Sequence, residues 1–433
     1  MLRAAAITIV SAGLAGALTP ALAQRVPIIT GGMGMNVLIE TDGTVKSWGG
    51  AGGEAADLGD GTERTRELPA PIPGLGNIVG GSVGFGHVLL VAADGTVYGW
   101  GRNNRCELGV KDDRRRRTPM VIPGVSGAVQ VVAGKEFSAA LLRDGTVRAW
   151  GSNDDGLLGI GKTAKELDCS YTPVVVEGLS GVKRLVAAEA GNVLALKQDG
   201  TVWGWGANKG GILCDGTTED RTRPVQMKGI SNAVDVDISD HSAIVLADGT
   251  LRMCGRAESG AMADGGKGIR STPWKVAGVA NAVAVKTNRG ATLVRLKDGT
   301  LLGWGYSLFG SLGDGKVDHV DAKPHAPIGL GPVLAHYWAS NSGFAVRADG
   351  TVMQWQVHKG DNWLTKPSPF IQVRMDGEIA QRETAATPPS AEPAPAAPAS
   401  AQPVSRPAAT QPAAPGAQDI ERGVRALRGI FGR

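Results

Sequence analysis

The chain contains 433 residues, which is ample for a large folded core with additional segments at its ends. Its formal net charge is only +4, so no strong overall field attracts a polyanion, and we expect no nucleic-acid partner. The four cysteines include no C-x-x-C pair, which argues against a zinc site or a redox motif.

The first 23 residues have the parts of a secretory signal peptide. Arg3 supplies positive charge, residues 4–18 are apolar and small, and Ala21-Leu22-Ala23 offers a cleavage site before Gln24. The alternatives are a first buried strand or a membrane anchor, but the run is short for a spanning helix. We therefore expect export across a bacterial inner membrane, to the periplasm or beyond, with association with the cell envelope left open.

A tetrapeptide of Asp-Gly-Thr followed by Val or Leu then recurs at intervals of about fifty residues. The aspartates of its seven copies are Asp42, Asp94, Asp144, Asp199, Asp248, Asp298 and Asp349. Such a period indicates one supersecondary unit copied in series. Because they recur with the turns, the aspartates are predicted to be structural rather than catalytic.

A large or sulfur-containing side chain stands six residues after each of these aspartates. It is Cys254 in the fifth copy and tryptophan in the others, namely Trp48, Trp100, Trp150, Trp205, Trp304 and Trp355. A third recurring feature, which we call the third mark, is a segment of the type LGDG that follows in six copies. Most copies close with a proline, a short apolar segment and a glycine. The indole rings offer large apolar areas for packing between neighbouring sheets.

The second copy shows which strands one repeat unit is expected to form. The segment GHVLLVAADGTVYGWG, from Gly86, places Asp94-Gly95 between two apolar runs, which favours a hairpin with a tight primed turn. The strand AVQVV from Ala128 and the proline-marked segment would complete about four strands in this unit. Seven such sheets bury their faces if they close into a ring, so we predict an all-β, seven-bladed β-propeller over residues 24–375. The alternative is an open solenoid, which would need polar capping repeats.

This pattern resembles the regulator of chromosome condensation repeat family, in which seven repeats carry "DGxVxxWG" and "GxLG". The resemblance covers roughly residues 26–373. It implies a seven-bladed propeller that binds another macromolecule across one face, as a nucleotide-exchange factor, a chromatin binder or a protein-docking module. The predicted signal peptide favours an exported bacterial branch and argues against exchange on a cytosolic GTPase.

Residues that depart from the repeat pattern are predicted to carry the function, since such residues map to loops on the propeller faces. We expect them to contact a protein partner, although ordinary solvation or packing is the alternative for each. The candidate partner-binding residues are Asn103, Asn104, Arg114, Arg115, Arg116, Arg117, Asp154, Asp155, Trp338 and Trp363.

No motif indicates catalysis, a cofactor or a metal. The segment GLLGIGKT, residues 156–163, fits the phosphate-loop pattern, but it coincides with the third mark of copy three and leaves no room for the helix that such a loop needs. His87 and His241 fall at matching places in two copies, which predicts a structural role. We therefore expect a protein that is not an enzyme and has no cofactor.

The cysteines Cys106, Cys169, Cys214 and Cys254 all lie in the repeat region. In an oxidising compartment they allow two disulfides with three alternative pairings; free buried thiols are the other reading. Cys214 and Cys254 occupy repeat positions that normally hold Gly and Trp, which predicts packed sites.

The remaining residues divide into a spacer and a short tail. Residues 376–418 are rich in Pro and Ala, which predicts a disordered, extended linker. Residues 419–433 regain a helical period, with Ile420, Val424, Leu427 and Phe431 in one stripe and arginines elsewhere on the wheel. This basic amphipathic helix could dock, contact a membrane surface weakly, or remain frayed.

The sequence thus predicts an exported, monomeric interaction module that binds a protein through one propeller face. A carbohydrate- or cell-wall-binding propeller is one alternative, and it would require equivalent aromatic and polar residues in several blades. A hydrolase or lyase is the other, and it would require titratable groups that converge near the axis.

Overall fold

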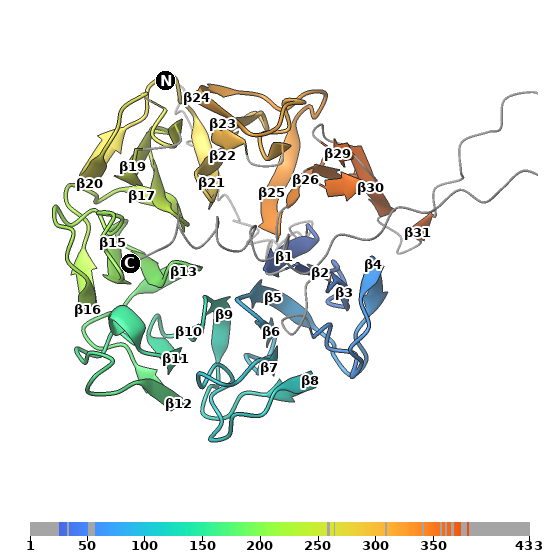
Figure 1. The fold of residues 1–433 in the computed structure, drawn as a ribbon, viewed down its shortest axis with the longest axis vertical. Coiled ribbons are helices and arrows are strands. Elements are labelled where there is room, and N and C mark those ends of the chain that lie inside the picture. Colours follow the sequence, from blue (N-terminus) through green and yellow to red (C-terminus); the bar gives the residue numbers. More distant parts are fainter. Residues whose placement is uncertain are drawn as a thin grey trace, which may run out of the picture. The chain divides into compact units, whose positions relative to one another are not determined.

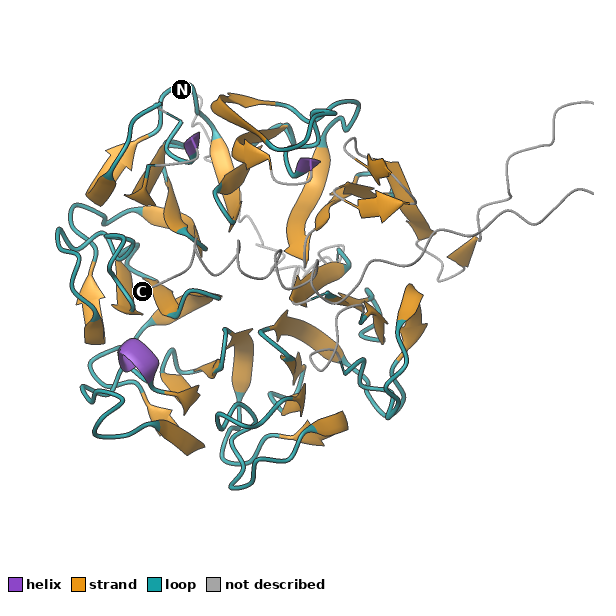
Figure 2. Ribbon diagram, viewed as in Figure 1, coloured by secondary structure: helices purple, strands orange, loops and turns teal. Residues whose placement is uncertain are grey.

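The computed structural model describes residues 26–32, 34–50, 57–257, 260–263, 265–307, 310–339, 342–355, 357–359, 362–364, 368–373 and 379–380. The described residues from 26 to 373 form a ring of antiparallel sheets that stand around a central axis (Figure 1). Helix is confined to short turns between strands, as Figure 2 shows. The predicted seven-bladed β-propeller is confirmed.

Each blade consists of four strands in chain order, with the first strand at the axis and the fourth at the outer edge. The first strands are β1 (Ile28–Gly32), β5 (Ile78–Val83), β9 (Ala128–Ala133), β13 (Val182–Ala188), β17 (Ala233–Ile238), β21 (Ala282–Asn288) and β25 (Val333–Ala339). The second strands are β2 (Met35–Ile39), β6 (His87–Ala92), β10 (Phe137–Leu142), β14 (Asn192–Lys197), β18 (His241–Leu246), β22 (Ala291–Leu296) and β26 (Ser342–Arg347).

The third strands carry the repeated tryptophans and the fourth strands form the outer edge of each blade. The third strands are β3 (Val45–Gly49), β7 (Val97–Gly101), β11 (Val147–Ser152), β15 (Val202–Gly206), β19 (Leu251–Arg256), β23 (Leu301–Ser307) and β27 (Val352–Trp355). The fourth strands are β4 (Arg66–Pro71), β8 (Arg116–Val121), β12 (Cys169–Val175), β16 (Arg221–Gln226), β20 (Ile269–Lys275), β24 (His319–His325) and β30 (Ser368–Val373). The remaining elements are η1 (Asp154–Gly156), β28 (Val357–Lys359), β29 (Asn362–Leu364) and β31 (Ile379–Ala380).

One strand belongs to a different blade from the one predicted. AVQVV forms β9, which pairs antiparallel with β10 and is therefore the first strand of blade 3, not a late strand of blade 2. The first strand of blade 2 is instead β5, which precedes the apolar strand β6 and pairs with it. The physical reason is proximity, since a short turn returns the chain from Ala133 to Phe137 and the two strands pair at once.

The hairpin turns also differ in detail from the expected primed type. In blade 2 the Gly95 N–H donates to Ala92 O at 2.9 Å and the Ala92 N–H donates to Thr96 O at 2.9 Å. Gly95 has a φ of +90°, whereas Asp94 is not in the left-handed region. This is the three-residue hairpin loop in which a type I turn is followed by a glycine bulge. The same pair of backbone hydrogen bonds recurs at all seven Asp-Gly-Thr turns.

The repeated tryptophans pack between their own blade and the blade before it, as predicted, and we call them wedge tryptophans. The Trp150 indole is fully buried, and its Nε1–H donates to Glu107 O of blade 2 at 2.8 Å. Four further tryptophans donate in the same way to the preceding blade: Trp100 to Asp57 O, Trp205 to Leu157 O, Trp304 to Ala261 O and Trp355 to Ser311 O. Each accepting residue directly precedes the Leu or Met of the third mark. One indole therefore joins two blades by apolar packing and by a hydrogen bond.

The ring closes where blade 7 meets blade 1. A single parallel pair, Gly31 with Ala339, joins β1 to β25 and makes one nine-stranded sheet of the two blades and β31. Beside it, the rings of Trp48 and Phe344 meet edge to face with centroids 6.2 Å apart. Both blades are continuous in sequence, so closure depends on these packing contacts and not on an exchanged strand.

The predicted signal peptide and the predicted helix at 419–433 lie outside the described residues. Of the predicted linker from residue 376, only β31 is described, and it pairs with β30 through Gln372–Ala380 and Val373–Ile379. None of the helices among the described residues has the length and apolar character needed to cross a bilayer.

Candidate interaction surface

The two faces of the propeller differ in how strictly they follow the repeat. We call one the hairpin face; it carries the seven Asp-Gly-Thr turns and the connections to the next blade. We call the other the loop face; it carries the connections from first to second strand and from third to fourth strand of each blade. On the hairpin face, each turn aspartate accepts the backbone N–H of the Thr two residues later, for example Thr96 at 2.9 Å from Asp94. Hydrogen bonds from the hydroxyl and the backbone N–H of this Thr hold the pKa of all seven carboxyls below their ordinary value, so the aspartates serve the turns.

Three loops of the loop face are organised by an asparagine that the sequence analysis did not recognise as a repeat mark. Asn103, a predicted partner-binding residue, is buried, and its Oδ1 accepts the Leu108 N–H at 2.8 Å. Asn153 and Asn208 accept the N–H of the leucine five residues later in the same way. The signal was present in the sequence, because each asparagine stands three residues after the wedge tryptophan. Asn103 therefore shapes its loop from inside.

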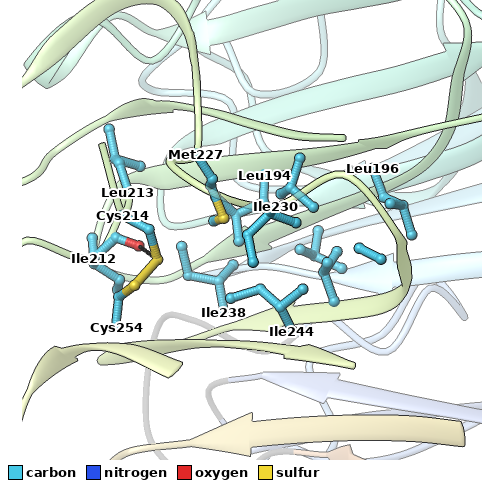
Figure 3. Close-up of a cluster of buried hydrophobic side chains, with 14 of the residues drawn as sticks. Leu194, Leu196, Ile212, Leu213, Cys214, Met227, Ile230, Ile238, Ile244 and Cys254 are labelled. Carbon is cyan, nitrogen blue, oxygen red and sulfur yellow. Dashed lines mark hydrogen bonds between the residues drawn. A yellow bond between two sulfur atoms is a disulfide. The ribbon is translucent and has the colours of Figure 1, made fainter. Parts of the chain in front are cut away.

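Both disulfides of the structure connect neighbouring blades. Cys214, in the loop after β15 of blade 4, pairs with Cys254 on β19 of blade 5, with the two Cα atoms 5.7 Å apart. Figure 3 shows this pair at one end of the apolar core between blades 4 and 5, beside Ile212 and with Ile244 farther along the core. The cysteines that replace Gly and Trp in the repeat thus meet each other, which confirms the prediction of packed sites.

The reason for this pairing lies in how a wedge tryptophan normally packs. At the other contacts between neighbouring blades, which we call seams, the residue after the third-mark Leu or Met is glycine or, at Ala263, alanine. The indole of the next blade leaves little room there for a larger side chain. A Cβ added at Gly59 would lie 2.9 Å from Trp100 Cε2, and one added at Gly159 would lie 3.1 Å from Trp205 Nε1. Where Cys254 replaces the indole, that space accommodates the side chain of Cys214. Ser242 still donates to the corresponding carbonyl, Ile212 O, at 2.6 Å.

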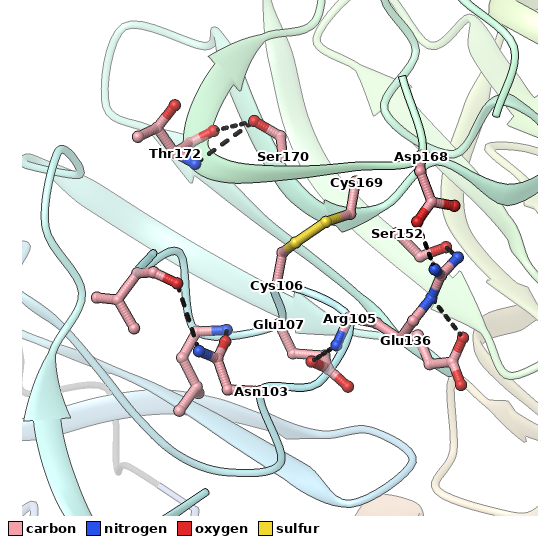
Figure 4. Close-up of a disulfide and its surroundings, with 12 residues drawn as sticks. Asn103, Arg105, Cys106, Glu107, Glu136, Ser152, Asp168, Cys169, Ser170 and Thr172 are labelled. Carbon is pink, nitrogen blue, oxygen red and sulfur yellow. Dashed lines mark hydrogen bonds and ion pairs between the residues drawn. A yellow bond between two sulfur atoms is a disulfide. The ribbon is translucent and has the colours of Figure 1, made fainter. Parts of the chain in front are cut away.

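The second disulfide, Cys106–Cys169, joins the loop after β7 of blade 2 to the start of β12 in blade 3, with Cα atoms 6.1 Å apart. Arg105 strengthens the same connection, as Figure 4 shows. Its Nη1 donates to Asp168 Oδ2 at 2.7 Å and its Nη2 to Asp154 Oδ1 at 3.1 Å. The hydrogen bond to Asp168 raises the pKa of the guanidinium further. Two adjacent loops of the loop face are therefore held both covalently and by charge.

The predicted arginine run is largely engaged within the propeller. Arg115 forms an ion pair with the buried Asp57 of blade 1, and Arg117 forms one with Glu63 of the same blade. Arg116 Nη2 lies 2.7 Å from Asp112 Oδ2 within its own loop. Arg114 is exposed, and its backbone N–H donates to Asp112. The structure thus places three of the four side chains in ion pairs and leaves Arg114 directed to solvent.

The other predicted contact residues are spread over the ring. Asn104 is exposed beside Arg105, and Asp154 and Asp155 are exposed in η1 of blade 3. Asp155 has a φ of +53°, in the left-handed region, and partial desolvation together with the nearby Asp220 raises the pKa of its carboxyl. The structure therefore brings Asn104, Asp154 and Asp155 into the loops that Arg105 connects. Trp363 lies on β29, and the surroundings of its side chain are outside the described residues.

Trp338 lies on β25, the first strand of blade 7, away from the loops that Arg105 connects. Its ring meets that of the wedge residue Trp355 edge to face, with centroids 6.5 Å apart. It also lines a cavity of about 400 Å³ in the central channel. The walls of this cavity are the first strands, and the cavity extends to the loop face, where Glu189 and Ser239 follow the ends of β13 and β17.

Titratable groups that the sequence analysis missed meet in this channel. Arg184 Nη1 lies 2.7 Å from Asp235 Oδ1, and Lys286 Nζ lies 3.3 Å from Asp237 Oδ1. These four residues come from three neighbouring blades and occupy the first strands, where the sequence showed short apolar segments interrupted by single charges. Burial raises the pKa of the Asp235 carboxyl, and Arg184 opposes that rise. Nearest the mouth, Arg289 Nη2 and Glu189 Oε2 are 3.6 Å apart and connect blades 6 and 4.

Two of the histidines lie at matching seams. His87 Nε2 is 3.0 Å from Ser138 Oγ of the next blade, and His241 Nε2 is 2.7 Å from Thr292 Oγ1 of the next blade. In both cases the partner lies 51 residues later, one repeat along the chain. Burial lowers the pKa of each imidazole to about 4. The structural role predicted for both is confirmed by these contacts.

The segment that fits the phosphate-loop pattern lies between β11 and β12. Its Gly161 N–H donates to Thr222 O at 2.7 Å, and its Thr163 N–H donates to Glu166 Oε2 at 2.8 Å. These donors thus serve the protein itself. Over the described part of the chain, no group of three or more His, Cys, Asp or Glu side chains is arranged to hold a metal ion.

Comparison with known families identifies the repeat. Residues 94–141, 144–195 and 199–246 match the regulator of chromosome condensation (RCC1) repeat, and residues 78–105 and 128–157 match a second model of the same repeat. Residues 78–246 are thus repeats of the regulator of chromosome condensation type. The remaining blades have the same strand order and turn, so the repeat extends around the ring.

Solved structures of other proteins share the fold at low sequence identity. Yeast RCC1 (Prp20) bound to Kap60 superposes with a TM-score of 0.64 at 19% identity, over 80% of this chain and 85% of that chain. A structure of Prp20p from Saccharomyces cerevisiae, whose binding to Gsp1p and histones is described with it, gives 0.61 at 19% identity, over 80% and 86%. Human WBSCR16 gives 0.61 at 18% identity, over 74% and 90%. At this identity the likeness concerns the fold.

Proposed function

We propose that this regulator of chromosome condensation repeat protein is an exported, non-enzymatic interaction module that binds a protein partner through its loop face. The observation that carries the proposal is the joining of unequal loops on that face. Cys106–Cys169 and Arg105 hold together loops of blades 2 and 3 that differ in sequence, while the hairpin face repeats one turn seven times. A surface that is unequal from blade to blade and already ordered suits recognition of one partner, because little ordering entropy is lost on binding.

Export is supported by the predicted signal peptide and by the pairing of all four cysteines. Disulfides persist in oxidising compartments and are rare in the cytosol. Yeast Prp20 is bound to a protein in one solved structure, which is consistent with a propeller of this type acting on macromolecules. The partner of this chain and the exported bacterial setting remain parts of the proposal.

The binding proposal is tested by affinity capture with the full-length protein from an envelope fraction. The matched pair of variants is Asn104→Lys on the loop face and Gln198→Lys on the hairpin face, since both side chains are exposed. We expect the loop-face variant to lose at least about ten-fold of the captured partner and the hairpin-face variant to retain it, because a lysine buried at an interface is costly. Equal capture by both variants, or no macromolecule above background with the unaltered protein, would contradict the proposal.

Export is tested by expressing the chain with its own first 25 residues in a Gram-negative host. We expect the protein in the periplasmic fraction, beginning at Gln24 by N-terminal sequencing, with no free thiol in the denatured protein. Recovery in the cytosol with Met1 intact and four reactive thiols would contradict it.

A further inference from the structure

The cavity in the central channel has two chemically different walls. On one side, β13, β17 and β21 contribute Arg184, Asp237 and Lys286. On the other side, β1, β5 and β25 contribute small and aromatic residues, among them Gly31, Gly81 and Tyr337. The charged wall thus faces a wall that offers little competing charge, in a space of about 400 Å³.

The carboxylates of the charged wall are already occupied. Asp235 accepts from Arg184 through Oδ1 and from the Val285 N–H through Oδ2, at 2.7 and 2.9 Å. Asp237 accepts from Lys286 through Oδ1 and from the Thr287 N–H through Oδ2, at 3.3 and 2.8 Å. Their side chains are only 6% and 12% exposed, so they lie behind the cations.

The cations, by contrast, retain hydrogen-bond donors for the cavity. An ammonium carries three N–H donors and a guanidinium five. The described partners of Lys286 and Arg184 in the channel are one carboxylate oxygen each. Their side chains are 28% and 32% exposed. The cavity therefore meets N–H groups and positive charge, although the ion pairs are neutral in sum.

A buried histidine lies within reach of the charges of these cations. His336 lies on β25, and its pKa is lowered to about 3 by burial first and then by the positive charges of Lys286, Arg295 and Arg184.

We propose that the channel cavity is an anion-binding site that takes a carboxylate group, held by Lys286 and Arg184. A carboxylate offers two oxygens to these donors and carries one charge. A dianionic phosphate would meet stronger repulsion from Asp235, Asp237 and Glu189. The carboxylate can come from a free small dicarboxylic acid or from an acidic side chain of a protein partner that covers the channel mouth; the second source rests on the function proposed above.

The site is tested by calorimetric titration of the full-length protein with succinate, with its diamide and with inorganic phosphate. The key variant is the double substitution Asp237→Asn and Lys286→Met, which removes a whole ion pair and leaves an amide oxygen to accept the Thr287 N–H. Its matched control is Glu40→Gln with Lys46→Met, which removes an ion pair of 2.8 Å in blade 1, away from the cavity. Far-ultraviolet circular dichroism and thermal midpoints show whether both double variants remain folded.

We expect saturable succinate binding that weakens at least ten-fold in the channel variant and is unchanged in the blade 1 control. Arg184→Lys keeps the charge and loses the guanidinium fork, so it should weaken binding by a smaller factor. Absence of saturable succinate binding, equal affinity in the two double variants, or equal or tighter binding of the diamide or of phosphate would each overturn the proposal.

The capture experiment distinguishes the two possible sources of the carboxylate. Succinate that competes with the captured partner assigns the site to a partner's acidic side chain, and succinate that binds without competing assigns it to a free dicarboxylate. If capture persists while succinate fails to bind, the anion site is wrong and the interaction module stands. If succinate binds and no partner is captured, the anion site stands and the proposed interaction module is wrong.

Discussion

The seam between blades 3 and 4 and the seam between blades 4 and 5 solve the same packing problem in two ways. At the first, the Trp205 indole fills the space over Gly159 and donates to Leu157 O at 2.8 Å. At the second, Cys254 replaces the indole and bonds covalently to Cys214 in the position of that glycine. The difference shows that the two repeat positions vary together: where the indole is absent from one blade, a side chain larger than that of Gly or Ala fits on the blade before it.

The two seams share some packing features and differ in one contact. Both seams keep a buried apolar core, and both keep the third-mark leucine, Leu158 in one and Leu213 in the other, fully buried. What changes is the last contact toward the loop face, from an indole hydrogen bond to a disulfide. Stability should therefore depend on filling the space and less on the chemistry that fills it.

The largest expected effect is the removal of a wedge. Trp205→Ala should lower the free energy of unfolding by about 4 kcal/mol, because a fully buried indole and its hydrogen bond are lost and a cavity remains. Trp203→Ala on the same strand is the control. The Trp203 ring is half-buried beside Lys197 Nζ, at 5.6 Å, and its loss should cost less than about 1 kcal/mol. If urea-induced unfolding gave the same loss of free energy of unfolding for both variants, the tryptophan between the blades would contribute no more to stability than the half-buried Trp203.

The next effect concerns the covalent seam. Replacing the pair by Cys214→Gly and Cys254→Ala opens a loop closed across 40 residues and should cost about 3 kcal/mol. Cys214→Gly with Cys254→Trp installs the arrangement of the neighbouring seam and should recover most of that loss, without sensitivity to reductant at this seam. Failure of the tryptophan variant to exceed the alanine variant in thermal midpoint would contradict the equivalence of the two seams.

Two further seams carry a buried histidine and should respond to pH. Burial lowers the folded-state pKa of His241 to about 4 from 6.5. Between these values the unfolded chain binds a proton that the folded chain does not, so the free energy of unfolding falls as pH drops from 6.5 toward 4. His241→Asn should remove roughly 1–3 kcal/mol of that fall between pH 7.5 and 4.5. An unchanged pH dependence of unfolding in the variant would refute the assignment.

The smallest effect is expected at the charged connection between blades 2 and 3. Arg105→Gln should lower stability by less than about 1 kcal/mol, because its ion pairs with Asp154 and Asp168 are open to solvent. The disulfide Cys106–Cys169 beside it should hold the loops together in the variant. A loss as large as that of the disulfide pair would mean that charge, and not the covalent bond, fixes these loops.

The repeat could be predicted from the sequence because its marks are local. Each Asp-Gly-Thr turn is closed by hydrogen bonds within a few residues, and each wedge tryptophan stands six residues after its aspartate, so spacing alone gave seven blades and a closed ring. Even the asparagine that organises three loops was readable, at a fixed offset from Trp100, Trp150 and Trp205.

What the sequence alone determined is therefore the blade: its turn, its buried second strand and its indole. The tertiary structure decided everything that connects one blade to another, namely the partner of each indole, the pairing of Cys214 with Cys254, the ion pairs of the arginine run and the charges that meet in the channel. These contacts join residues about one repeat apart or from non-neighbouring blades, and a periodic sequence does not show where each blade begins. That phase is set by strand pairing at the axis, which places Arg184, Asp237 and Lys286 in the wall of one channel, with Asp235 buried behind Arg184.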